Sequence, residues 1–129
     1  MFIKTATLIM VAMVVSPAGP QEFGTARQNA EENGTPLVVV VGADWCPACV
    51  QMKTNTLPEV ERSGVLANTE YTYVDYDSNP DLARKLMRGT SIPQLMRFQY
   101  KEQDEQWTVR RYQGSPRSVQ QVSGFIAGN

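Results

Sequence analysis

The only two cysteines of the chain, Cys46 and Cys49, lie in the segment Asp44-Trp45-Cys46-Pro47-Ala48-Cys49. A two-residue spacing brings both sulfurs within disulfide reach without a large change in the backbone. The segment follows a run of valines and is predicted to begin a helix, whose N-terminus favours a thiolate. We expect Cys46 to face solvent as the attacking thiolate. Cys49, one helical turn inward, would then resolve the mixed disulfide.

Four neighbouring residues are candidates for tuning this pair. Pro47 fixes φ at the first helical position, where a backbone N–H would have no partner. Trp45 offers a flat apolar surface beside the sulfurs. Asp44 and Lys53 are candidate modulators of thiol acidity, because Asp44 places an anion near the thiolate and Lys53 follows Cys49 by four residues on the same helical face. A solvated surface lysine is the alternative interpretation of Lys53.

Other uses of two nearby cysteines differ in their requirements. A structural zinc site needs four N or S ligands, whereas the chain has two cysteines and no histidine. A structural disulfide over two residues would remove little chain entropy and would stabilise the fold little. A thiol metallochaperone for Cu(I) needs only the two sulfurs and remains an alternative, as does a redox-inert binding module. We predict no metal and no organic cofactor.

Length and charge limit the remaining classes of function. The chain has 129 residues, enough for one domain with a core, and a formal net charge of −1. That charge gives no basic surface for nucleic acid. The lack of histidine removes Cys–His and Ser–His catalysis. The basic pair Arg110-Arg111 puts one arginine on each face of a predicted strand, so we do not predict a binding patch there. We expect a monomer.

The first 18 residues resemble an export signal. Lys4 precedes an apolar run over residues 6–15, and Ser16-Pro17-Ala18 supplies small residues for cleavage after Ala18. We therefore predict a signal peptide over 1–18, or an uncleaved anchor, and one domain over 19–129. Export to a periplasmic or other extracytoplasmic compartment would allow disulfides to form and persist.

The apolar pattern predicts an α/β domain with an additional N-terminal helix. Strand–helix–strand units require parallel pairing, and the short connection at 101–106 requires an antiparallel pair, so the sheet is mixed with helices on both faces. A break or kink is expected at Pro58. Ser115 is the predicted cap of the last helix, with Pro116 at its first position. The predicted helices are 21–33, 46–56, 58–67, 79–89 and one from 115 onward, and the predicted strands are 37–41, 71–76, 95–100 and 107–112.

Three features together resemble the thioredoxin superfamily over about residues 22–127: the segment 45–49, Ile92-Pro93 before a strand, and Gly114 before the last helix. The resemblance implies a thioredoxin-like fold with a four-stranded mixed sheet in the order 2-1-3-4. It implies that Pro93 is a cis-proline beside the redox pair. It also implies that the Ile92 backbone pairs with an incoming peptide, so that Trp45, Pro47, Ile92 and Pro93 bind the substrate.

Two positions depart from the thioredoxin pattern. Val40 stands where the family carries a buried aspartate beneath the resolving cysteine, and Tyr73 stands at the position of its lysine partner. Within the superfamily the chain is similar to the C-terminal periplasmic domains of transmembrane disulfide reductases. The proline at position 47, between the two cysteines, is instead similar to the motif of thiol oxidases. Asp44, however, opposes the thiolate that a strong oxidant needs. We therefore predict an exported thiol–disulfide oxidoreductase that acts as a reductant, with cysteine-containing protein substrates and a separate electron partner.

Overall fold

The computed structural model describes residues 19–128. The predicted signal peptide over 1–18, with its cleavage site, lies outside the described residues, so these assignments stay predictions. Within residues 19–128, no helix is both long enough and apolar enough to cross a membrane.

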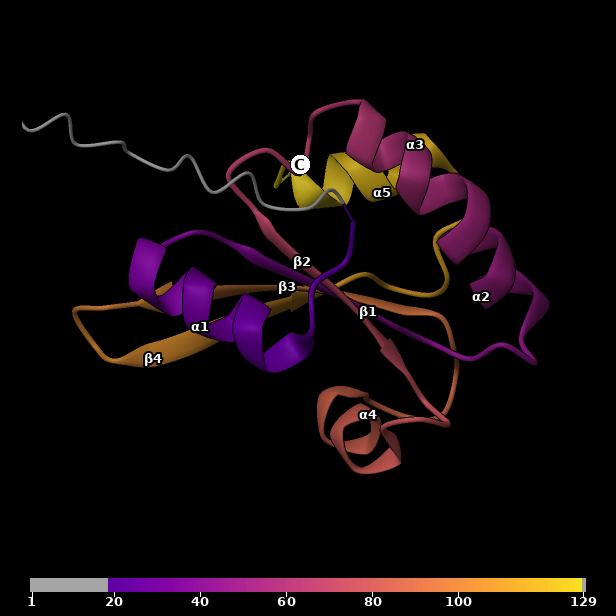
Figure 1. Cartoon of the computed structure of the whole chain (residues 1–129), viewed down its shortest axis with the longest axis horizontal. Helices are drawn as coiled ribbons and strands as arrows, with labels where there is room; N and C mark the ends of the chain where they lie inside the picture. Colours follow the sequence, from indigo (N-terminus) through magenta and orange to yellow (C-terminus); the bar gives the residue numbers. More distant parts are fainter. Residues whose placement is uncertain (1–18, 129) are drawn as a thin grey trace, which may run out of the picture.

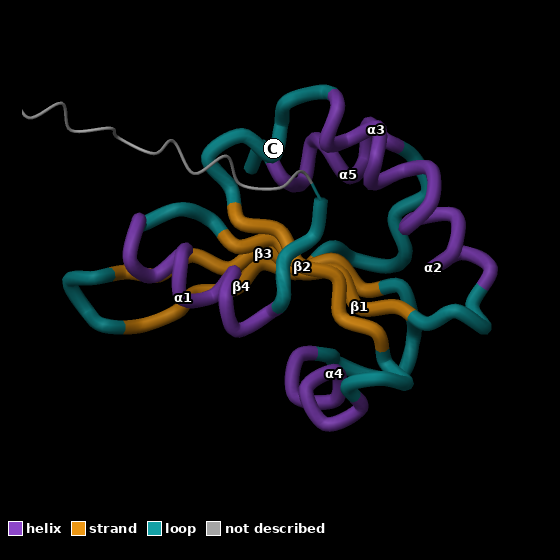
Figure 2. The backbone as a smooth tube through the Cα atoms, viewed as in Figure 1, coloured by secondary structure: helices purple, strands orange, loops and turns teal. Residues whose placement is uncertain are grey.

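A mixed sheet of four strands in the order β2-β1-β3-β4 forms the centre of the domain (Figure 2). Strand β1 pairs parallel with β2 and antiparallel with β3, and β3 pairs antiparallel with β4. The predicted strand order is confirmed. Every residue of β1 is buried, because the strand has a neighbour on each edge and helices on each face. The strands are β1 (Leu37–Gly42), β2 (Glu70–Asp75), β3 (Gln94–Lys101) and β4 (Gln106–Arg111).

Helices cover both faces of the sheet (Figure 1). One face carries α1 (Phe23–Asn33) and α4 (Pro80–Leu86), and the other carries α2 (Pro47–Gln51), η1 (Met52–Thr56), α3 (Leu57–Arg62) and α5 (Val119–Ile126). The alternate side chains of β1 divide the core accordingly. Val38 and Val40 pack with α3 and α5, while Val39 and Val41 pack with α1 and α4.

The N-terminal helix α1 begins at Phe23, two residues later than predicted. The Glu22 carboxylate caps it by accepting hydrogen bonds from the backbone N–H groups of Gly24 and Thr25, both at 3.0 Å. These bonds lower the pKa of Glu22. Gln21 instead forms a bridge beside Thr72 of β2, so the residue is held by the sheet edge rather than by the helix.

Of the break or kink predicted at Pro58, the break is wrong, because one helical path runs through residues 47–62. In a regular α-helix the Pro58 ring would clash with the carbonyl four residues earlier. The π-helical segment η1 precedes it, and there the Leu57 N–H reaches back five residues to the Met52 carbonyl. This wider turn lets the helix continue from the cysteine pair into α3.

Two other predicted helix ends are also wrong. The cap of α5 is Ser118 rather than Ser115: Ser118 and Gln121 form a reciprocal capping box, which satisfies more backbone N–H groups than a serine alone. Helix α4 ends at Leu86, ahead of Gly89. The Gln94 side chain accepts a hydrogen bond from the Arg88 N–H, and this bond fixes the following loop outside the helix.

Candidate redox site

The two cysteines lie where β1 ends and the helical path over 47–62 begins. Cys46 has an extended backbone, with φ −98° and ψ 110°, and occupies the N-cap position of α2. Its Sγ accepts a hydrogen bond from the Cys49 backbone N–H at 3.3 Å. Pro47 follows as the first helical residue, as predicted for a position whose N–H has no helical partner. The Cys46 sulfur therefore lies on the helix N-terminus, where partial positive charge favours a thiolate. Both cysteines are free thiols in this structure.

Cys46 is more covered than the sequence suggests. The residue is 8% exposed, and Cys49 is fully buried. The Cys46 thiol donates a hydrogen bond to the Ile92 carbonyl, with 3.8 Å between the sulfur and the oxygen, so the loop that carries Ile92 covers it. The expectation that Cys46 faces solvent openly is therefore wrong. Only its remaining edge can meet a substrate sulfur, and Cys49 cannot meet one directly.

The Ile92–Pro93 turn lies directly beside the pair. The peptide bond between these residues is cis, Pro93 is buried and Ile92 is half-buried. Ile92 and Trp45 line the same cavity of about 480 Å³, together with Tyr76 and the rim residue Arg84. Trp45 is 66% exposed, so its ring is available to a docking chain. The structure thus brings Trp45, Ile92 and Cys46 to one surface.

Burial raises the pKa of the Cys49 thiol. The pKa reaches about 12, and the hydrogen bond between the two cysteine side chains adds to the rise. At neutral pH Cys49 is consequently a protonated thiol, while Cys46 lies at the helix N-terminus. The two thiols differ in environment as an attacking and a resolving cysteine should differ.

Tyr73 lies beneath Cys49. From the sequence it stood out only as a departure from the family pattern. It pairs in register with Val40 on the adjacent strand. A Cβ added to Gly42 would collide with the Tyr73 hydroxyl oxygen and would lie 3.0 Å from Cys49 Cβ. Burial raises the pKa of the Tyr73 phenol, and the neighbouring Cys49 raises it further. The signal that could have found this contact is a glycine ending a valine strand, which often marks a close approach.

Asp44 and Lys53 pair with each other at the surface. The Lys53 Nζ lies 3.8 Å from Asp44 Oδ1 and 5.2 Å from the centre of the Tyr73 ring. Both side chains are at least half exposed, so the pair contributes little to stability. Its influence on the cysteine sulfurs stays a prediction. Among residues 19–128, no three side chains of His, Cys, Asp or Glu gather as ligands of a metal ion would.

Alkaline pH is expected to destabilise the reduced protein through Cys49. In the unfolded chain its thiol ionises at about pH 8.5, whereas the folded state raises its pKa to about 12. The folded state therefore holds this proton more tightly, and the stabilisation is complete below the unfolded pKa and is lost as pH rises toward the folded one. Urea unfolding of the reduced protein at about pH 8 and about pH 10 should show the loss. A smaller loss is expected for Cys49→Ala, and an equal loss in both proteins would contradict the assignment.

The fold and the site together define a thioredoxin-like protein with both cysteines of the C-x-x-C segment present. The profile of the thioredoxin-like domain family matches residues 23–123, and the chain belongs to this family. A sequence search among curated proteins finds no match.

Solved structures agree with this assignment. A thioredoxin from Thermus thermophilus is 26% identical, with a TM-score of 0.61 and coverage of 82% of this chain and 79% of that one. The Trxlp protein of Edwardsiella tarda EIB202 is 22% identical, with a TM-score of 0.64 and coverage of 83% and 95%. The Trx4 domain of ERdj5 is 19% identical, with a TM-score of 0.61 and coverage of 78% and 88%. The last two likenesses concern the fold alone.

Proposed function

We propose that the protein is an exported thiol–disulfide oxidoreductase that reduces disulfides in cysteine-containing proteins. The observation that carries this proposal is the arrangement of the pair. Cys46 Sγ caps a helix and accepts the Cys49 N–H at 3.3 Å, while Cys49 lies fully buried one turn further along. One thiol is thus prepared to attack, and the other to follow it.

The exchange proceeds in two balanced steps. The Cys46 thiolate attacks one sulfur of the substrate disulfide, and a Cys46–substrate bond forms as the substrate S–S bond breaks. The released substrate thiolate takes up a proton. Cys49 then loses its proton and attacks Cys46 Sγ, which breaks the mixed disulfide and releases the second substrate thiol. The substrate has then gained two electrons, and the protein carries a Cys46–Cys49 disulfide.

The site chemistry supports the reductive direction. A strong oxidant requires a strongly stabilised thiolate in its reduced form. Within residues 19–128, the hydrogen bonds to the Cys46 sulfur come from the backbone N–H and the thiol of Cys49, and neither donor is charged. The Lys53 ammonium is directed to Asp44 and the Tyr73 ring. This modest stabilisation favours a reductant, whose disulfide a separate electron partner must reduce after each cycle.

Docking of the substrate is proposed at the surface that Trp45, Pro47, Ile92 and Pro93 surround. Trp45 and Ile92 line one cavity, and the Ile92 carbonyl already accepts a hydrogen bond from Cys46. An extended peptide beside Ile92 could form hydrogen bonds with the Ile92 backbone while presenting its disulfide to Cys46. The apolar segment before residue 19 is the reason for proposing that the protein is exported. Export agrees with a substrate that carries disulfides.

Reduction of insulin by the protein, with dithiothreitol as the electron source, tests the proposed activity. We expect the wild type to accelerate insulin precipitation. With Cys46→Ser the rate should be at least about a hundredfold lower, because a serine hydroxyl cannot replace the thiolate. Cys46→Ser should keep its fold, since the exchange removes no buried volume of consequence. Equal rates with and without the wild-type protein would contradict the proposal.

A further inference from the structure

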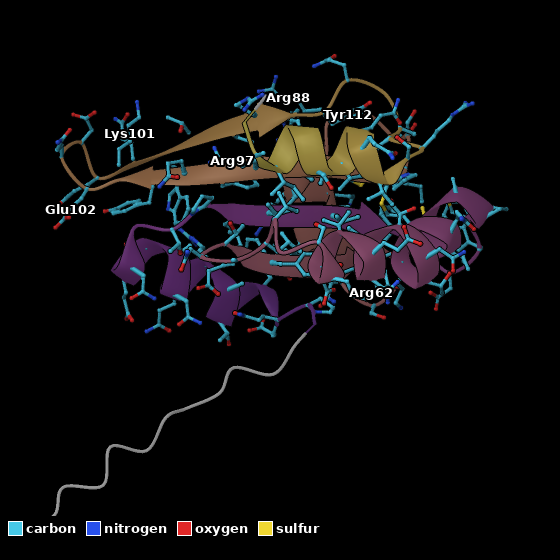
Figure 3. The ribbon with its side chains drawn as sticks, turned by 90° about the horizontal axis from the view of Figure 1, so that it is seen from above. Arg62, Arg88, Arg97, Lys101, Glu102 and Tyr112 are labelled. Carbon is cyan, nitrogen blue, oxygen red and sulfur yellow. The ribbon has the colours of Figure 1, made fainter. Side chains whose placement is uncertain are left out.

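A second pocket, of about 440 Å³, is lined by Pro93, the residue after Ile92 of the Trp45 cavity. Arg88 comes from the loop after α4, and Arg111 comes from the end of β4. Gln94 and Ser91 add polar atoms, and none of the residues that line the pocket is Asp or Glu. Figure 3 labels Arg88 and Tyr112, another residue of this wall, at the same edge of the molecule. The pocket therefore has two positive charges and no negative one.

Arg111 is fixed with part of its hydrogen-bonding capacity unused. One terminal nitrogen, Nη1, donates to the Leu86 carbonyl at 2.7 Å, which anchors the guanidinium beneath the end of α4. Its Nε is buried and has no partner among the residues that the structure describes. Nε is closed off from the pocket, so a ligand oxygen there would bind the terminal N–H groups of the guanidinium that do not contact Leu86.

The loop that carries Arg88 is also held in place. The Gln94 side chain accepts a hydrogen bond from the Arg88 N–H at 3.1 Å. It donates to the carbonyls of Arg88 and Ser91, both at 2.8 Å. One glutamine thus fixes the loop to the start of β3 at three backbone groups. The Arg88 side chain is exposed at the mouth of the pocket, on a backbone that is already ordered.

The two arginines repel each other. Burial lowers the pKa of the Arg111 guanidinium, and the charge of Arg88 lowers it further. The ion pairs within residues 19–128 are Asp44–Lys53 and Asp81–Arg84, and neither includes Arg88 or Arg111. An anion between the two guanidinium groups would relieve this repulsion and accept hydrogen bonds from both. Arginine suits a carboxylate in particular, because its planar donors match the two oxygens.

The place of the pocket indicates which carboxylate it would bind. Pro93 lines it, and the preceding Ile92 carbonyl lies 3.8 Å from Cys46 Sγ. A peptide aligned on Ile92 would pass the pocket within a residue or two of its own cysteine. We propose that the pocket formed by Arg88 and Arg111 binds an acidic side chain of the substrate polypeptide next to the disulfide under attack. This inference rests on the proposed function and names the substrate class: disulfides flanked by Asp or Glu.

Two disulfide-linked peptides that differ only in Glu or Gln beside the cysteine test the selectivity. We expect the wild type to reduce the Glu peptide with about a tenfold higher kcat/KM, which corresponds to one charge-assisted contact. Arg88→Gln and Arg111→Gln should lower this preference to below about twofold. Arg62→Gln removes an equal charge from the exposed end of α3 and should keep the full preference. Equal reduction of both peptides by the wild type would overturn the inference.

Binding without redox chemistry separates this inference from the proposed function. The same peptides with serine in place of cysteine are titrated against the protein, and the Arg111 Nε–H resonance is followed by NMR. We expect the Glu peptide to shift this resonance, the Gln peptide to leave it in place, and Arg88→Gln to abolish the shift. If the resonance shifts in a protein that reduces neither disulfide peptide, the binding pocket is supported and the proposed oxidoreductase function is rejected. No shift with either peptide would reject the pocket, whatever the redox activity.

Discussion

Replacing Cys49 with serine is expected to convert the protein into a trap for its substrates. Cys46 keeps its place at the helix N-terminus and still attacks, but no thiol lies beneath it to break the mixed disulfide. The complex should therefore persist, with a lifetime at least about a hundredfold longer than in the wild type. Non-reducing electrophoresis after mixing with insulin should show the added mass of one insulin molecule, and dithiothreitol should remove it.

The matched variant Cys46→Ser distinguishes trapping from nonspecific oxidation. Cys49 is fully buried and its pKa is raised to about 12, so it should not attack a protein disulfide on its own. We expect no insulin adduct with Cys46→Ser. An adduct of similar yield in both variants, or in neither, would show that the roles of the two cysteines are assigned wrongly.

Adding a single methyl group at Gly42 is expected to destabilise the protein and to displace Cys49. In Gly42→Ala the new Cβ would collide with the Tyr73 hydroxyl and press on Cys49 Cβ, which would be 3.0 Å away. Cys49 is fully buried, so it cannot move aside freely. Overpacking of this kind costs about 1–3 kcal/mol. Urea unfolding of the reduced protein measures the loss, and the insulin rate should fall as Cys49 is displaced.

Two variants test the physical cause of that loss. Tyr73→Phe removes the oxygen that the methyl group meets, so the double variant Gly42→Ala with Tyr73→Phe should recover part of the stability. Gly124→Ala is the matched control in α5, where nothing lies within 4 Å of the added carbon. It should gain about 0.5–1 kcal/mol from helix propensity. A Gly42→Ala protein as stable as the wild type would refute the close packing of Tyr73.

The fold could be predicted from the sequence because its strongest signals are local. The five residues Leu37 to Val41 are apolar and mostly β-branched, which predicts a strand buried on both faces, and β1 is buried throughout. The short connection before Trp107 required an antiparallel pair, which is confirmed. Helix ends were less predictable, since Ser118 with Gln121 forms a better cap than Ser115.

The effect of Pro58 on the helix was also not predictable from the proline alone. The sequence predicts a break at Pro58 from the missing N–H and the ring clash. The structure avoids both with the π-helical turn η1, in which the Leu57 N–H bonds to Met52. A single-residue rule cannot anticipate this rearrangement, because it depends on the five residues before the proline.

The site was predictable where it follows from one segment. Cys46, Cys49 and Pro47 lie as the motif implies, because strand, turn and helix follow each other directly along the chain. Contacts between distant segments were not predictable. Arg110 and Arg111 do lie on opposite faces, with Arg110 over the Phe125 ring and Arg111 at Leu86. The proximity of Arg111 to Arg88 arises only when β4 packs beside the loop after α4.

The reduction potential of the Cys46–Cys49 couple tests the central claim most directly. The protein is equilibrated in buffers of reduced and oxidised glutathione, and the fraction of disulfide is read after alkylation of the free thiols. A reversible two-electron transition close to the thioredoxin value, about −270 mV, is the result that the proposed reductant predicts. A potential near −120 mV would identify an oxidant instead. A pair that forms no disulfide in any buffer would contradict a redox function.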